Sequence, residues 1–140
     1  MGKKTDMKIT SELKNIKAVS AEITSRIEKT KEGISRDTLF DIKLCVEEAV
    51  RNAMIHGNRS DKKQHVLVSY EIEADKVRIT IEDNGNGFKV RDLPDPTHSD
   101  NLYAEGGRGV YIMHRLMDKV QYNQKGNRVT MEKRFILKGA

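Results

Sequence analysis

The sequence predicts an α+β fold, a two-layer sandwich in which helices cover one face of a mostly antiparallel sheet. Apolar residues recur at intervals of three and four in three segments, which is typical of amphipathic helices. Two adjacent segments alternate apolar and polar residues across a short turn, which is typical of a β-hairpin. No internal repeat interrupts the 140 residues, so we expect one domain over residues 1–140 with a lid at approximately residues 88–106.

The composition favours a folded, cytoplasmic protein. Charged residues make up 34% of the chain, and 26 Lys and Arg outweigh 21 Asp and Glu to give a net charge of +5. Acidic residues separate the basic ones, so direct nucleic-acid binding is not indicated. Cys45 is the only cysteine and is expected to be a small buried hydrophobe. The sequence shows neither a membrane-spanning apolar run nor a signal peptide, which predicts a cytoplasmic location without membrane contact.

The first part of the chain predicts a strand and two helices. A short strand is expected at residues 7–10, and Ser11 is a suitable N-cap for the first helix, which Gly33 ends. Ser35 is a suitable cap for the second helix, with Asp37 in the first turn, where the helix dipole favours an acidic side chain. The apolar positions expected to bury the first helix are Leu13, Ile16, Val19, Ile23 and Ile27.

The second helix, expected over residues 39–58, has a polar face beside its apolar stripe. Glu48 and Asn52 are four residues apart and therefore lie one turn apart on the same face, and His56 extends that line. Such a row fits either the wall of a functional site or a solvated surface, and the helix alone does not distinguish between them. The apolar stripe comprises Leu39, Ile42, Val46, Ala49 and Ala53.

A β-hairpin with its turn at residues 74–75 follows, and Asp83, Gly85 and Gly87 form a D-x-G-x-G motif at its end. The alternatives are a hairpin turn and a calcium loop, but no matching strand follows, and Pro94 stands where a calcium loop needs glutamate. A carboxylate at a strand end can instead accept a hydrogen bond from an exocyclic amine, while glycines admit a flat ring. The alternating apolar residues are Val66, Val68, Tyr70, Ile72, Val77, Ile79 and Ile81.

A glycine-rich segment, Gly-Gly-Arg-Gly at residues 106–109, opens the third helix after a loop. Free N–H groups at a helix N-terminus favour an anion, and a flexible hinge is the alternative. Two final strands are expected to begin at Val120 and to end near Phe135, with a turn around Gly126. The apolar side of the third helix comprises Ile112, Met113, Leu116 and Met117.

In combination, these motifs resemble those of the GHKL family, whose ATP-binding domain is the Bergerat fold shared by DNA gyrase, MutL and histidine kinases. They are E-x-x-x-N on a helix, D-x-G-x-G after a hairpin, and G-x-G at the start of a helix. The stretches EEAVRNAMIHGN and GGRGVYIMHRLMDKV, in a domain of this size, are similar to those of anti-sigma factor serine/threonine kinases of the RsbW type. The resemblance implies ATP and Mg²⁺ as cofactors.

The resemblance assigns the catalytic role to Glu48, which matches the general base that takes a proton from the attacking hydroxyl. Asn52 matches the residue that ligates Mg²⁺. Glu47 is the rival for the base. It points about a hundred degrees away around the helix, and we expect it to pair with Arg51 in a structural role.

The resemblance also assigns the nucleotide contacts. Asp83 matches the acid that binds the adenine amino group, the glycines of its motif match the purine slot, and those before the third helix match residues that hold the phosphates. Arg108 departs from many members of the family, and it either contacts a phosphate or faces solvent. The residues implied to bind ATP are Asn52, Asp83, Gly85, Gly87, Gly107, Arg108 and Gly109.

The function implied is that of an ATP- and Mg²⁺-dependent kinase that phosphorylates a serine or threonine of a STAS-type anti-anti-sigma protein. A sigma factor or similar regulator is the expected second partner, and a homodimer is the expected assembly. One alternative is an ATP-responsive partner-binding module without kinase activity, although such a module does not need a base. Another is a nucleic-acid-associated ATPase fragment, which the dispersed charge and the lack of a transducer domain disfavour.

Overall fold

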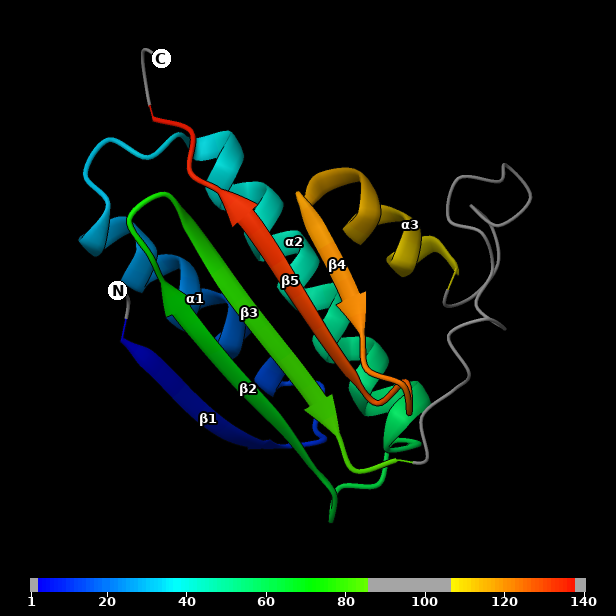
Figure 1. Cartoon of the computed structure of the whole chain (residues 1–140). Coiled ribbons are helices and arrows are strands. Elements are labelled where there is room, and N and C mark those ends of the chain that lie inside the picture. The colour runs from blue at the N-terminus through cyan, green and yellow to red at the C-terminus, as the bar shows by residue number, and fades with distance from the viewer. Residues whose placement is uncertain (1–2, 86–106, 138–140) are drawn as a thin grey trace.

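The computed structural model describes residues 3–85 and 107–137, which form an α+β fold of two layers (Figure 1). The fold class predicted from the sequence is confirmed. The helices are α1 (Asn15–Thr30), α2 (Arg36–Asn52), the short π-helix η1 (Ala53–Gly57) and α3 (Gly107–Leu116). The strands are β1 (Lys4–Thr10), β2 (His65–Ile72), β3 (Lys76–Asp83), β4 (Lys119–Tyr122) and β5 (Arg128–Arg134).

The described strands form one antiparallel sheet in the order β1-β2-β3-β5-β4. Strands β2 and β3 are the predicted hairpin, with Val68 opposite Ile81 and Tyr70 opposite Ile79. Because β5 pairs with β3 on its other side, β3 lies in the interior of the sheet. The helices lie together on one face of the sheet, with α2 crossing behind its central strands (Figure 1). The end of β3 is thereby placed beside the end of α2.

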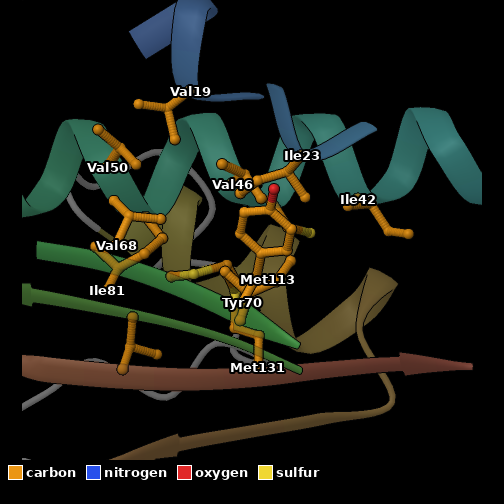
Figure 2. Packing of buried hydrophobic residues seen from close by; sticks show 14 of the residues in the cluster. Val19, Ile23, Ile42, Val46, Val50, Val68, Tyr70, Ile81, Met113 and Met131 are labelled. Atoms are coloured by element: carbon orange, nitrogen blue, oxygen red, sulfur yellow. The ribbon is translucent and has the colours of Figure 1, made fainter. Parts of the chain in front are cut away.

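A hydrophobic core fills the space between the helices and the sheet (Figure 2). On the sheet side, Val77, Ile79 and Ile81 are at most 2% exposed, which confirms the alternation predicted for the hairpin. On the helix side, Val46 is fully buried, as is Cys45, which the sequence predicted to be a small core residue. Burial of each such aliphatic side chain contributes about 1.5–3 kcal/mol, so this core fixes α2 against the strands.

The starts of the two long helices differ from each other in how they are capped. Ser35 caps α2 as predicted, and its hydroxyl accepts a hydrogen bond from the N–H three residues later over 3.1 Å. The prediction that Ser11 caps α1 is wrong. Both its N–H and its hydroxyl donate to the carbonyl oxygen of Gln64, over 3.2 and 3.1 Å, because Ser11 directly follows β1 and lies beside the residue that precedes β2. Leu13 therefore precedes the helix and is 63% exposed instead of buried.

Strand β1 is longer than the expected residues 7–10, since it pairs with β2 along its whole length. The lid expected at residues 88–106 lies outside the described residues. In the part of the chain that is described, no helix is both long and apolar enough to cross a bilayer.

Candidate nucleotide site

The predicted polar face of α2 lies at the C-terminal end of the helix, where the α-helix gives way to η1. Glu48 and Asn52 lie one turn apart on this face, as expected. Beyond them, the N–H of Asn58 donates to the carbonyl oxygen of Ala53 over 2.8 Å, a span of five residues instead of four. His56 lies within this π-turn and is exposed.

Asp83 ends β3, and its carboxylate lies directly against Gly57, the last residue of η1. A Cβ atom on Gly57 would overlap this carboxylate, and a Cβ atom on Gly85 would overlap the carbonyl oxygen of Gly57. Oδ1 of Asp83 accepts a hydrogen bond from the N–H of Gly85 over 2.8 Å. Among the described residues no donor reaches Oδ2. This oxygen is therefore the acceptor that the site offers to a ligand, above a surface formed by glycine backbone.

Asp83 is only 7% exposed, and this environment changes the acidity of its carboxyl group. Burial raises the pKa of Asp83 above its ordinary value, and the hydrogen bond from the Gly85 N–H opposes that rise. A buried carboxylate with one unused oxygen gains from an N–H donor, because that donor replaces the lost hydration.

Two buried asparagines fix the backbone around Asp83. The side-chain amide of Asn127 donates to the carbonyl oxygen of Asp83 over 3.0 Å, and the N–H of Asp83 donates to the carbonyl oxygen of Asn127 over 2.9 Å. Oδ1 of Asn58 accepts from the N–H of Asn84 over 2.8 Å. Sequence reasoning missed both asparagines, as it missed Gly57. Their partners are distant in the sequence, so no local pattern distinguishes them from ordinary turn residues.

The first turn of α3 lies against the polar face of α2. A Cβ atom on Gly109 would stand 2.9 Å from Oε2 of Glu48 and 3.1 Å from Nδ2 of Asn52. Only glycine allows the α3 backbone to approach two polar side chains this closely. The fold thus brings the E-x-x-x-N motif and the glycine-rich motif together, although the whole hairpin separates them in the sequence.

The remaining predicted site residues are described only in part. Gly107 is the first residue of α3, and Arg108 follows it in the same turn. The side chain of Arg108 lies outside the described part of the structure, as does the whole of Gly87. Their assigned contacts with ATP stay predictions.

The acidic pair on α2 differs from the prediction in one respect. Arg51 pairs with Glu48, with Nη1 of Arg51 3.0 Å from Oε1 of Glu48, and not with Glu47 as predicted. Glu47 instead accepts a hydrogen bond from the hydroxyl of Ser20 in α1 over 2.6 Å. The spacings of three and four residues are both compatible with a helical pair, and the packing of α1 against α2 decides between them.

The described residues fit a magnesium–nucleotide complex. One end offers Oδ2 of the buried residue Asp83 as an acceptor, beside a glycine surface that a Cβ atom would fill. The other end offers the carboxylate of Glu48 and the amide of Asn52, whose side chain makes no hydrogen bond within the described residues. Oxygen atoms of this kind are the ligands that Mg²⁺ prefers, and the N-terminus of α3 beside them favours phosphate groups.

Comparison with known proteins gives consistent matches. The family described as the histidine kinase-like ATPase domain matches residues 9–133. The serine-protein kinase RsbW of Bacillus licheniformis is 34% identical over 111 residues, which cover 74% of this chain and 69% of that protein. An anti-sigma F factor of Clostridium perfringens (strain SM101 / Type A) is 35% identical over 104 residues, covering 71% and 74% of the two chains. RsbW of Staphylococcus aureus (strain MSSA476) is 30% identical over 128 residues, covering 81% and 80%.

Proposed function

The chain belongs to the histidine kinase-like ATPase family, and on this premise we propose that it is an ATP- and Mg²⁺-dependent serine/threonine protein kinase of the anti-sigma factor type. The observation that carries the proposal is the meeting of Glu48, Asn52 and Gly109 where α2 contacts α3. A carboxylate, a metal-binding amide and a helix N-terminus at one point are the groups that phosphoryl transfer needs.

The nucleotide base binds at the end of β3 in this proposal. Oδ2 of Asp83 accepts a hydrogen bond from the adenine amino group, and the backbone of Gly57 and Gly85 forms the surface beneath the ring. Gly87, which lies outside the described residues, is assigned to the same slot by the family resemblance alone. The Gly85 N–H keeps the other carboxylate oxygen in place, so the aspartate presents one defined acceptor.

The phosphates bind at the start of α3, which comprises Gly107, Arg108 and Gly109, and where Gly109 meets the polar face of α2. Asn52 would hold Mg²⁺, which would neutralise charge on the phosphates. Glu48 takes the proton of the attacking serine or threonine hydroxyl while the oxygen of that hydroxyl bonds to the γ-phosphorus and ADP leaves. The base and the metal ligand lie one helical turn apart, so they can act on the same phosphoryl group.

The names of the relatives support a sigma factor as one partner, while the STAS-type acceptor and the homodimer rest on the family resemblance. We propose that the acceptor is a STAS-type anti-anti-sigma protein and that a sigma factor is the alternative partner, in a cytoplasmic protein that forms a homodimer. This proposal draws on the relatives that are called anti-sigma F factor and serine-protein kinase. An acceptor hydroxyl must reach Glu48, so the acceptor docks on the side of the site where α2 and α3 meet.

The test uses Glu48→Gln and wild type with Mg²⁺ and ATP. Calorimetry measures ATP binding, and labelled ATP with a candidate STAS-domain protein measures transfer. Glu48→Gln keeps the size and a carbonyl oxygen of the side chain but cannot take the proton, so we expect ATP affinity to persist and transfer to be lost. Transfer by this variant at the wild-type rate would show that another group is the base. ATP binding without any transfer by wild type would instead identify an ATP-responsive binding module.

A further inference from the structure

The two carboxylate oxygens of Glu48 have different neighbours. Oε1 lies 3.0 Å from Nη1 of Arg51, one helical turn further along α2. Oε2 lies on the side of the first turn of α3, close to the position that a Cβ of Gly109 would take. One oxygen is therefore held by a cation, and the other faces the place where the proposed function puts the phosphates.

We propose that Arg51 is a positioning residue, which holds the Glu48 carboxylate so that Oε2 is turned toward the acceptor hydroxyl. This inference rests on the proposed function, because it takes Glu48 to be the base. A glutamate side chain has three rotatable bonds, and an unrestrained carboxylate samples many orientations. A planar guanidinium bound to one oxygen limits that freedom and fixes which oxygen is presented.

The surrounding groups leave Arg51 free for this role. Glu47, the other acid within reach along the helix, is bound by the Ser20 hydroxyl and does not compete for the guanidinium. Within the described residues, Glu48 has no other ion-pair partner. In this proposal one contact, the ion pair with Arg51, sets the orientation of Glu48. Substitution of Arg51 removes that contact.

The pair is also exposed enough to be removed without loss of the fold. The side chains of Arg51 and Glu48 are 42% and 22% exposed. Ion pairs at such positions contribute little to stability, because water screens them and ordering two long side chains costs entropy. A loss of rate after substitution of Arg51 therefore reports on the position of Glu48 and not on unfolding.

A second role for Arg51 competes with this one and makes a different prediction. Arg51 lines a shallow surface groove together with Leu13, Lys14, Ile16, Lys17 and Glu47. An arginine that contacts the acceptor protein in this groove would change the KM for that acceptor. An arginine that orients the base changes kcat instead, because it alters only the presentation of the proton-accepting oxygen.

The experiment compares Arg51→Gln and Arg51→Lys with wild type, and Arg36→Gln serves as the matched control. Arg36 is an exposed arginine at the start of the same helix, without an ion pair among the described residues. We expect Arg51→Gln to lower kcat about fivefold, with the Kd for ATP and the KM for the acceptor unchanged. Arg51→Lys restores most of the rate, since it keeps a cation near Oε1, and Arg36→Gln behaves as wild type.

Three results would overturn the inference: a wild-type kcat in Arg51→Gln, an effect confined to the acceptor KM, or a loss of ATP affinity as large as the loss of rate. Glu48→Gln, measured in parallel, separates this failure from that of the proposed function. If Glu48→Gln loses transfer while Arg51→Gln keeps it, only the positioning role is wrong. If Glu48→Gln transfers phosphate at the wild-type rate, the assignment of the base itself is wrong.

Discussion

Gly57 and Asp83 are in contact without room for a Cβ atom between them, although a loop, the whole of β2 and the rest of β3 separate them along the chain. Gly57 is the last residue of η1, and Asp83 is the last residue of β3. The last residue of η1 thus lies against the carboxylate, so the proposed nucleotide site depends on the backbone of η1 as well as on the acid itself.

Replacement of Gly57 by alanine tests this contact. The added methyl group must displace the Asp83 carboxylate, so we expect Gly57→Ala to weaken ATP binding by about tenfold or more, measured by calorimetry. Gly33→Ala is the control. Gly33 has a φ of +82° and open space around it, so alanine there costs about 1 kcal/mol of stability through backbone strain but leaves ATP affinity unchanged. Wild-type affinity in folded Gly57→Ala would contradict the assigned position of Asp83.

The raised pKa of Asp83 predicts a pH dependence of ATP binding. In the proposed site the ionised carboxylate accepts the adenine hydrogen bond, so its contribution to ATP affinity is present above the raised pKa and is lost as the pH falls through it. Wild type should therefore lose affinity on acidification at a higher pH than an ordinary aspartate titrates. Asp83→Asn should bind ATP more weakly at neutral pH and should lack this loss. Parallel pH profiles of the two proteins would contradict the prediction.

The same raised pKa has the opposite effect on the stability of the nucleotide-free protein. Burial favours the protonated carboxyl in the folded state, so this contribution to stability is present below the unfolded pKa and is lost as the pH rises through the folded pKa. Denaturant unfolding of wild type and Asp83→Asn across this interval measures the difference. The free energy of unfolding of wild type should fall relative to that of Asp83→Asn as the pH rises.

A methyl group at Gly109 tests the phosphate end of the site. Alanine has the higher helix propensity, so Gly109→Ala does not weaken α3 by itself, but its Cβ would press on Glu48 and Asn52. We expect kcat to fall about tenfold or more, with a smaller change in ATP affinity, because the base and the metal ligand are displaced. His114→Ala, at an exposed position of the same helix, should keep wild-type kinetics. A wild-type kcat in Gly109→Ala would contradict the close contact of α3 with Glu48 and Asn52.

Cys45 provides a test of the packing of α2. The side chain is fully buried, and burial raises the pKa of its thiol to about 12, so almost no reactive thiolate forms at pH 8. We expect iodoacetamide to leave the native protein unmodified and to alkylate it rapidly in denaturant, as mass spectrometry can follow. Alkylation of the native protein at the rate of an exposed thiol would show that the contact of α2 with the core opens readily.

Local patterns predicted most of the secondary structure. The alternation in β2 and β3, the Ser35 cap and the apolar stripe of α2 depend on residues two to four positions apart, which share one element and one environment. The cap predicted at Ser11 failed because a distant carbonyl, that of Gln64, engages this residue. A capping prediction made from neighbouring residues takes no account of a hydrogen-bond partner more than 50 residues away.

The sequence by itself determined the fold class, the motifs Glu48–Asn52 and Asp83–Gly85, and the family they resemble, because periodicity and short motifs are properties of neighbouring residues. Only the tertiary structure decided that Gly57, Asn58 and Asn127 surround Asp83, and that Arg51 binds Glu48 instead of Glu47. The physical reason is that the contacts around Asp83 form between elements, and that the choice of Glu48 over Glu47 depends on the contact of Glu47 with Ser20 in α1. Backbone hydrogen bonds across the sheet and the packing of α1 and α3 on α2 select one partner among several that local geometry allows.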